Sequence, residues 1–230
     1  MTEFRFCNAG LAVAAGKRLD LRNVFAPHHT CNGIMRRLVL RLLRRVRAWS
    51  AGPNLCMAFA GDAAPCSELP DGYALATAPI SDAAWAQLLS AGGELGPWDA
   101  LRLHTEMALL VPETQVFLTG VDAQPVACAG VYERDPESWE IGWIAVHPEH
   151  RRRGLGEAVT GLALQRAVEL LPRAILLYTQ DHRLGAIRLY LRLGFEPALR
   201  HRSHRRRWRA ISKSLPREVA AHVVSSLQVN

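Results

Sequence analysis

The sequence predicts an α/β (α+β) fold in which a mixed central sheet carries helices on both of its faces. Three observations support this prediction. Segments with the two-residue period of strands alternate along the chain with segments of helical period. Residues 174–179 are apolar without alternation, as is typical of a buried central strand. Gly142 lies inside a strand-like segment, where glycine indicates a bulge or a close approach of another backbone.

The ordered segments begin after a boundary rich in proline and small polar residues at 64–72. Ser81 is placed to cap the first helix, with Asp82 in its first turn. Pro172 ends the longest helix, and Gly194 ends the last one. We expect helices at 81–91, 99–110, 155–171 and 184–193, and strands at 73–78, 114–119, 126–132, 139–146, 174–179, from 195 onward and at 208–212.

Charge divides the 230-residue chain into three regions. Residues 1–68 hold ten basic and four acidic side chains, and residues 197–215 hold seven basic and no acidic ones. The middle region holds sixteen acidic against ten basic side chains, which favours a cationic substrate such as an amine. We expect a basic N-terminal extension at 1–68 with an amphipathic helix near 33–49, a globular domain at 69–215 and a C-terminal tail at 216–230.

Composition argues against several other classes of protein. No apolar run approaches the roughly 18–20 residues that cross a bilayer, so no membrane span is expected. The first residues lack the layout of a signal peptide, which favours a cytoplasmic protein. The five cysteines form no C-x-x-C pair, and His28, His29 and Cys31 lack a second pair of ligands, so no metal is expected.

A short stretch with three arginines and two glycines carries the strongest chemical signal. It follows a strand and opens a helix, and glycines at such a place let the backbone come close to a ligand. The first N–H groups of a helix have no intrahelical partner, and the helix dipole favours negative charge there. The stretch therefore predicts a pyrophosphate site, to which the arginines add charge-assisted hydrogen bonds. Its residues are Arg151, Arg152, Arg153, Gly154, Leu155 and Gly156.

Two other phosphate-binding motifs fit this stretch poorly. A dinucleotide fingerprint needs glycine or alanine where the chain has Val159, and its turn after the strand is shorter. A Walker loop would continue with Gly-Lys-Ser or Gly-Lys-Thr, which is absent here.

The pattern Val146-x-Pro148-Glu149-His150-Arg151-x-x-Gly154-x-Gly156 resembles the acetyl-CoA signature of the GNAT superfamily of N-acetyltransferases. A second block at 186–195 is similar to the A-x-x-L-Y-x-x-x-G-F element of that family. The resemblance covers roughly residues 70–212 and implies the GNAT acyl-CoA N-acyltransferase fold. It also implies transfer of an acetyl or other short acyl group from acetyl-CoA to a primary amine, by direct attack in a ternary complex.

The same resemblance implies roles for individual residues. The pantetheine arm would pair with the strand that precedes the motif, and backbone N–H groups from Arg152 to Glu157 would hold the pyrophosphate. Tyr190 matches the tyrosine that protonates the departing thiolate. Arg183 stands where the family often has asparagine, so it would contact a phosphate or shape the acceptor pocket. The implied cofactor contacts are Ile144, Ala145, Val146, Arg151, Arg152, Arg153, Gly154, Leu155, Gly156, Glu157, Arg183 and Tyr190.

The acceptor amine must lose a proton before it can attack, because an alkylammonium has a pKa of about 10. Glu140 lies eleven residues before Arg151, the place of the base in the histone-acetyltransferase branch of the family. The alternative is a surface glutamate, with a water chain ending at a backbone carbonyl as the base. His147 would lie beside the phosphates instead. Three tryptophans either line the acceptor site or belong to the core: Trp85, Trp98 and Trp143.

The acceptor is left open by the sequence: a small-molecule amine, a peptide N-terminus and a lysine side chain all fit. Two other functions stay open, a catalytically inactive CoA-binding module and a nucleic-acid-associated protein that uses its basic ends. Nucleic acid is not the expected partner, because the basic run 201–209 falls where the family has a solvated loop between its last two strands. A homodimer is also left open.

Overall fold

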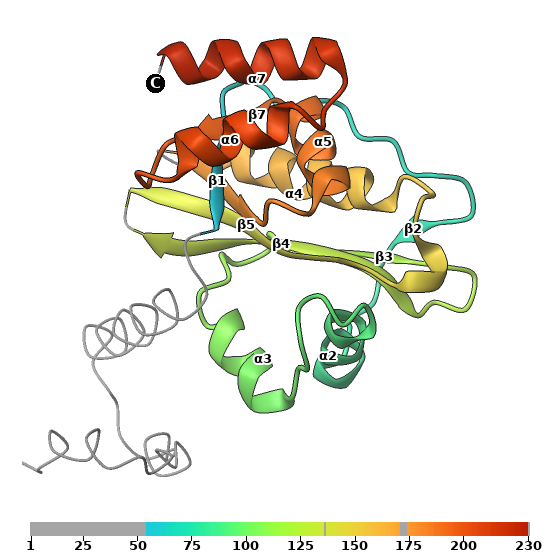
Figure 1. Ribbon diagram of the computed structural model, residues 1–230. Coiled ribbons are helices and arrows are strands. Elements are labelled where there is room, and N and C mark those ends of the chain that lie inside the picture. Colours follow the sequence, from blue (N-terminus) through green and yellow to red (C-terminus); the bar gives the residue numbers. More distant parts are fainter. Residues whose placement is uncertain (1–53, 136, 171–173, 230) are drawn as a thin grey trace, which may run out of the picture. The chain divides into compact units, whose positions relative to one another are not determined.

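The computed structural model describes residues 54–135, 137–170 and 174–229. The chain divides into two compact units, Met1–Gly52 and Pro53–Asn230. The first unit lies outside the described residues, and with it the amphipathic helix expected near 33–49. The second unit contains the sheet and its covering helices (Figure 1).

A mixed sheet of seven strands forms the centre of the second unit, in the order β2-β3-β4-β5-β6-β1-β7. Neighbouring strands are antiparallel except β5 and β6, which are parallel. The strands are β1 (Leu55–Phe59), β2 (Ala74–Leu75), β3 (Val116–Thr119), β4 (Pro125–Asp135), β5 (Ser138–Val146), β6 (Ile175–Thr179) and β7 (Phe195–Ala198).

Helices cover both faces of the sheet, which confirms the expected fold class (Figure 1). α2 (Asp82–Ala91) and α3 (Ala100–Met107) lie on one face. α4 (Leu155–Glu169), α5 (Leu184–Arg192), α6 (His204–Ser212) and α7 (Arg217–Val229) lie on the other. The side chains of Ser81 and Asp99 cap the first two helices by accepting hydrogen bonds from the backbone N–H groups of Ala84 and Arg102.

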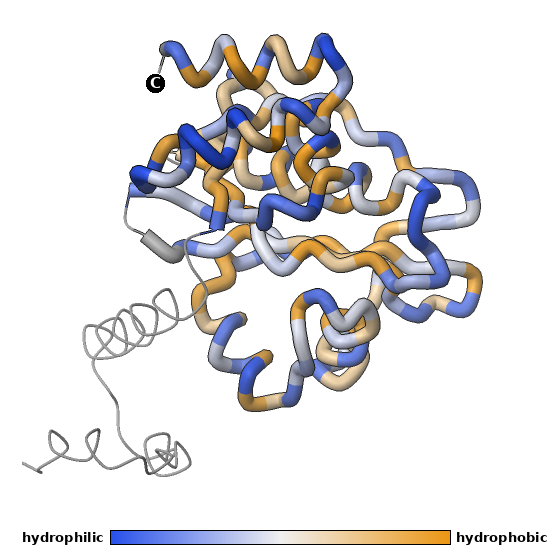
Figure 2. Tube along the Cα trace, in the orientation of Figure 1, coloured by the Kyte–Doolittle hydropathy of each residue, from blue (hydrophilic) through white to orange (hydrophobic). Residues whose placement is uncertain are grey.

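Two apolar layers hold the helices to the sheet. On the side of α4, small buried residues such as Ala163 let the helix come close to β4 and β5. On the side of α2 and α3, Trp85, Leu89 and Leu103 pack against Phe117 and the neighbouring strands. The strands at the centre of the sheet are correspondingly hydrophobic, whereas α6 is largely hydrophilic (Figure 2). The loop between β5 and α4 therefore starts and ends in well-packed elements.

The structure moves the expected boundary at residue 68 towards the N-terminus, because β1 belongs to the sheet. Met57 lies opposite Leu177 of β6 and Pro197 of β7, and it is fully buried. The connection from β1 to β2 then crosses α4, where Nε2 of Gln165 donates a hydrogen bond to the carbonyl of Pro65 over 3.0 Å. Part of the supposed extension is thus built into the core.

The C-terminal expectations were wrong in two places. Residues 208–212, expected as a strand, belong to α6, and residues 201–209 are not a loop between strands. The helical period is present in Trp208, Ile211 and Leu215, which are buried at intervals of three and four, but four arginines at 205–207 and 209 surround Trp208 in the sequence. The expected tail is the helix α7, which buries Val223 and Leu227.

Candidate active site

A bulge in β5 marks the centre of the site. Cys128 lies opposite Ala145 and Gly130 lies opposite Gly142, so β5 carries one residue more than β4 over this stretch. Trp143, within the bulge, has a φ of 50°, which is unusual for a bulky residue. The bulge expected from Gly142 is confirmed, and it turns the end of β5 away from a regular ladder.

The parallel strands β5 and β6 cease to pair after Glu140, just before the bulge. They are paired at Trp139 with Ile175 and at Glu140 with Leu176, and at no later position in the described chain. On its other edge β5 stays paired with β4 as far as Val146. Backbone groups of β5 that face β6 after Glu140 are therefore available to an extended ligand, which would pair with them as an added strand.

The loop that leaves β5 forms a concave backbone at the start of α4. It begins with a short 3-10 helix, η3 (Pro148–His150), and then passes through Arg152 with φ 60° and Gly154 with φ 82°. The first hydrogen bonds of α4 run from the N–H groups of Glu157 and Ala158 to the carbonyl of Gly154, both over 3.0 Å. The N–H groups before them point out of the helix end, and such an arrangement binds anions.

Side chains from distant parts of the chain brace this loop. Arg153 donates a hydrogen bond from Nη1 to Oη of Tyr73 over 2.9 Å, and Tyr73 shares a second hydrogen bond of 2.9 Å with Nδ1 of His150. Arg151 forms an ion pair with Glu94, with 3.2 Å between Nη1 and Oε1. Sequence reasoning missed Tyr73 and Glu94, because neither shares a motif with the loop.

Arg183 reaches the same region from the start of α5. Its Nη2 donates a hydrogen bond to the carbonyl of Glu94 over 3.0 Å. Its Nε and the Nδ1 of His147 are buried without a hydrogen-bond partner among the described residues. Since buried polar atoms are normally hydrogen-bonded, each of these atoms would suit a polar ligand or a water molecule beside it. The residues present therefore suit a phosphate-bearing cosubstrate such as acetyl-CoA.

Tyr190 lies on α5 and is 8% exposed, with its ring 6.4 Å from that of Phe195. Burial raises the pKa of Tyr190 to about 12, although the charge of Arg183 opposes the shift. The phenol therefore keeps its proton throughout the neutral range, as a proton donor must.

Glu140 lies on β5 between Tyr132 of β4 and Leu176 of β6. Burial raises the pKa of Tyr178, and the negative charge of Glu140 contributes to the same shift, which puts this carboxylate near the phenol. A Cβ added at Gly142 would come within 3.2 Å of Oε1 of Glu140. Glycine at this position thus leaves space beside the carboxylate.

The three tryptophans contribute mainly to the packing of α2 and α3. Trp85 and Trp98 are each 7% exposed, and Trp98 meets Trp143 edge to face with 4.6 Å between ring centroids. The guanidinium of Arg102 lies 4.1 Å from the ring centroid of Trp98. Trp85 and Trp98 therefore belong to the core, while Trp143 joins that core to the bulge.

Among the residues that the structure describes, no group of three or more His, Cys, Asp or Glu side chains is arranged to hold a metal ion. None of the helices in that part of the chain is both long and apolar enough to span a membrane.

Comparison with known proteins finds a family model, a curated relative and solved structures of similar fold. Residues 79–195 match the model of the acetyltransferase (GNAT) family. A curated mycothiol acetyltransferase from Corynebacterium efficiens is 30% identical over 109 residues, which make up 47% of this chain and 37% of that protein. The match thus spans little more than a third of the relative's length.

Solved structures show the same fold at low sequence identity. A GCN5-related N-acetyltransferase from Sphaerobacter thermophilus is similar with a TM-score of 0.52 and 22% identity, over 68% of this chain and 53% of that one. A protein from Drosophila is similar with a TM-score of 0.51 and 16% identity, over 69% and 55% of the two chains. These likenesses support the fold and leave the acceptor open.

Proposed function

The chain belongs to the GNAT acetyltransferase family, and we propose from this premise that it transfers an acetyl or other short acyl group from acetyl-CoA to a primary amine. One observation carries the proposal. The gap between β5 and β6 opens at the carboxyl ends of both strands, and the concave loop of α4 begins at that same end of β5. An extended amide chain that ends in a pyrophosphate fits such an arrangement.

Binding would use mainly backbone groups of this chain. Ile144, Ala145 and Val146 would pair with the amides of the pantetheine arm. The N–H groups from Arg152 to Glu157 would hold the pyrophosphate, and Arg151 and Arg183 would add charge.

Starting from the ammonium form, the nitrogen loses two protons on its way to the amide, and the departing sulfur gains one. Glu140 would take the first proton, which leaves a neutral amine. The amine nitrogen then forms a bond to the thioester carbonyl carbon, and the bond from that carbon to sulfur breaks. The second proton leaves the nitrogen to solvent water as the amide forms, and Tyr190 would supply a proton to the departing thiolate. The raised pKa of Tyr190 supports its part, because the phenol is protonated when the thiolate leaves.

The test is thermal unfolding of the wild-type chain with and without acetyl-CoA. A ligand at 100 times its dissociation constant adds about 2.7 kcal/mol to stability, which gives a clear rise in Tm. Gly154→Glu should abolish the rise, because it puts a carboxylate into the anion site. Gly185→Glu is the control, since a Cβ at this exposed glycine of α5 meets nothing within 4 Å.

If the wild type is folded and its Tm does not respond to acetyl-CoA, the proposed cofactor site is wrong. If the Tm responds, release of free thiol with a panel of small amines, peptides and lysine analogues would identify the acceptor class. A response in Tm without thiol release for any amine would contradict acyl transfer and favour a CoA-binding module.

A further inference from the structure

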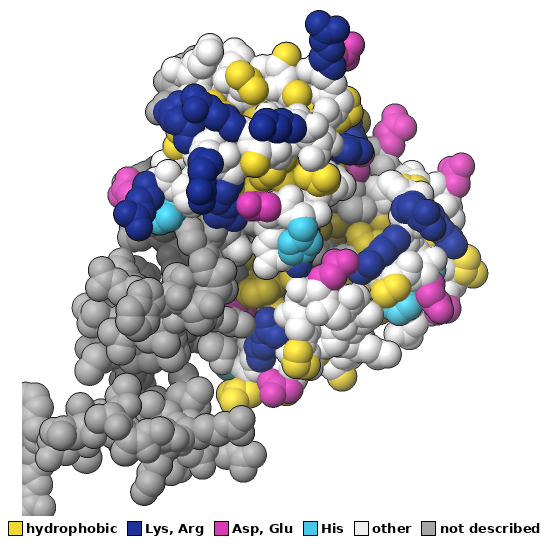
Figure 3. Space-filling model, viewed as in Figure 1, with side chains coloured by type: hydrophobic (Ala, Val, Ile, Leu, Met, Phe, Trp, Pro, Cys, Tyr) yellow, Lys and Arg dark blue, Asp and Glu magenta, His cyan; other side chains and the backbone are white. Residues whose placement is uncertain are grey.

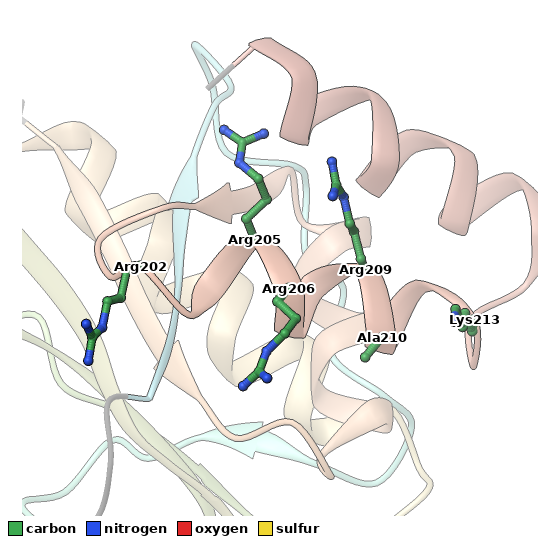
Figure 4. Close-up of a pocket in the computed structure, with 6 residues that line it drawn as sticks. All are labelled: Arg202, Arg205, Arg206, Arg209, Ala210 and Lys213. Carbon is green, nitrogen blue, oxygen red and sulfur yellow. The ribbon is translucent and has the colours of Figure 1, made fainter.

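The surface of α6 carries a row of cations that the proposed acyl transfer does not use. Its members are Arg206 and Arg209 within α6, Arg202 in the turn before the helix, and Lys213 at its C-terminal cap. All four are exposed. With Arg205 and Ala210 they line an open hollow of about 480 Å³ (Figure 4). We call these four residues the α6 cation row.

The α6 cation row has no acid to neutralise it in the described part of the chain. Two neighbouring arginines are engaged elsewhere: Arg205 donates to the carbonyl of Leu227, and Arg207 forms a two-pronged ion pair with Asp181. The four members of the row make no ion pair with any described residue. Lys and Arg side chains accordingly gather over α6 on the face shown in Figure 3.

The chemistry of this face favours a phosphate backbone over other anionic surfaces. Guanidinium groups bind phosphate oxygens through two parallel hydrogen bonds. Arg202 and Lys213 extend the row past the two ends of α6, so it offers contacts to more than one phosphate of a chain. A membrane surface would need apolar side chains to insert, and none of the large exposed hydrophobic residues of the described chain lies in α6. A protein interface would need an apolar centre, which this face also lacks.

We propose that the α6 cation row docks the phosphate backbone of a nucleic acid. The ion pair of Arg207 with Asp181 ties α6 to the loop between β6 and α5, two residues before Arg183. A docked strand would therefore lie beside the proposed acyl-transfer site, where it could bring an amine that is bound to nucleic acid. The docking itself does not depend on acyl transfer.

The test is fluorescence anisotropy of a labelled 20-nucleotide single strand, as RNA and as DNA, with the full chain at several salt concentrations. Each phosphate contact contributes about 0.7 to the slope of log affinity against log salt, and about fivefold in affinity at 0.1 M salt. R206Q/R209Q should therefore weaken binding about 25-fold and lower the slope by about 1.4. Glutamine keeps the helix propensity, and a thermal melt checks the fold.

The matched control is R188Q/R217Q, which removes the same charge from exposed positions on α5 and α7. The proposal requires this variant to bind almost as tightly as the wild type. It is overturned if both double variants weaken binding equally, because net charge alone then explains the affinity. It is also overturned if a polyglutamate peptide of equal charge competes as well as the oligonucleotide, which would assign the face to an acidic protein. Free thiol release with a small amine should be the same in both variants.

Discussion

At the scale of single residues, Tyr190 would supply a proton in the proposed reaction and Glu140 would remove one. Tyr190→Phe keeps the ring and its packing on Phe195 but removes the proton for the leaving thiolate. We expect kcat to fall about 100-fold or more, in the usual range for general acid catalysis, with the Kd for acetyl-CoA nearly unchanged. Stopped-flow thiol release measures kcat, and a binding titration measures the Kd for acetyl-CoA. A variant with full kcat would remove Tyr190 from the mechanism.

Glu140→Gln tests the base through the pH dependence of the rate. At neutral pH we expect kcat/KM to fall about 100-fold or more, because the acceptor is almost entirely ammonium. The defect should shrink as the pH approaches about 10, where the free amine becomes abundant. Glu133→Gln on the exposed part of β4 is the control. A defect that is equally large at every pH would point to a structural role for Glu140 and a water chain as the base.

At the scale of elements, the position of β1 has a direct consequence for the boundary between the two units. We propose that the catalytic unit begins near residue 53, so a chain of 54–230 should unfold cooperatively and respond to acetyl-CoA. A chain of 62–230 lacks β1 and with it the burial of Leu55 and Met57, each worth about 2–3 kcal/mol. Since domains are stable by only about 5–15 kcal/mol, the shorter chain should be unfolded or aggregated.

Circular dichroism and urea unfolding of the two truncated chains provide the measurement. Met57→Asp in the full-length chain gives an independent check, because it puts a charge at a fully buried place between β6 and β7. If the 62–230 chain were as stable as the 54–230 chain, β1 would not be part of the core.

Elements whose signals are local could be predicted from the sequence. The cap at Ser81, the apolar strand β6 and the glycines of the α4 loop each depend on residues within one or two turns of each other. β1 could not be placed in the same way, because its partners lie over 100 residues away and a five-residue apolar run does not specify them. In α6 the buried positions are separated by arginines, which hid the helical period.

The residues of the candidate site also divide into those with a local sequence signal and those that only the fold brings together. The proposed anion-binding loop is one continuous motif in the sequence, so its residues were predicted together. Tyr73 lies 80 residues from Arg153, and Glu94 lies 57 residues from Arg151 and 89 from Arg183, although the structure joins them by hydrogen bonds. Contacts of this kind depend on how α2, α3 and the first strands fold back over the sheet. The sequence alone offers no pattern that pairs these residues.

At the scale of the whole molecule, burial in the second unit keeps two thiols and one phenol protonated. Burial raises the pKa of Cys56 from 9.0 to about 11, that of Cys128 from 9.0 to about 12, and that of Tyr190 from 10.0 to about 12. Cys56 and Cys128 come from opposite halves of the sheet, and Tyr190 comes from the layer of helices above it. We therefore expect the free energy of unfolding of the whole unit to fall at alkaline pH.

The sign of this pH effect follows from proton linkage. Below pH 9 both states hold these protons, and the stabilisation is complete. Above pH 9 the unfolded chain releases thiol protons that the folded chain keeps, so the free energy of unfolding falls by about 1.4 kcal/mol per pH unit for each such group. For Cys128 the fall continues until its folded pKa of about 12. Urea midpoints and m-values between pH 8 and pH 11 should show a steady loss that begins near pH 9.

Cys128→Ala isolates the contribution of one buried thiol to the loss of stability above pH 9. We expect this variant to lose stability more slowly than the wild type above pH 9, by about 1.4 kcal/mol per pH unit, because alanine releases no proton on unfolding. Cys66→Ala should keep the wild-type dependence, since Cys66 is exposed. If the two variants and the wild type fell in parallel, burial of Cys128 would not be the source of the alkaline sensitivity. A free energy of unfolding that stayed level from pH 8 to pH 11 would contradict the raised pKa values of both buried thiols.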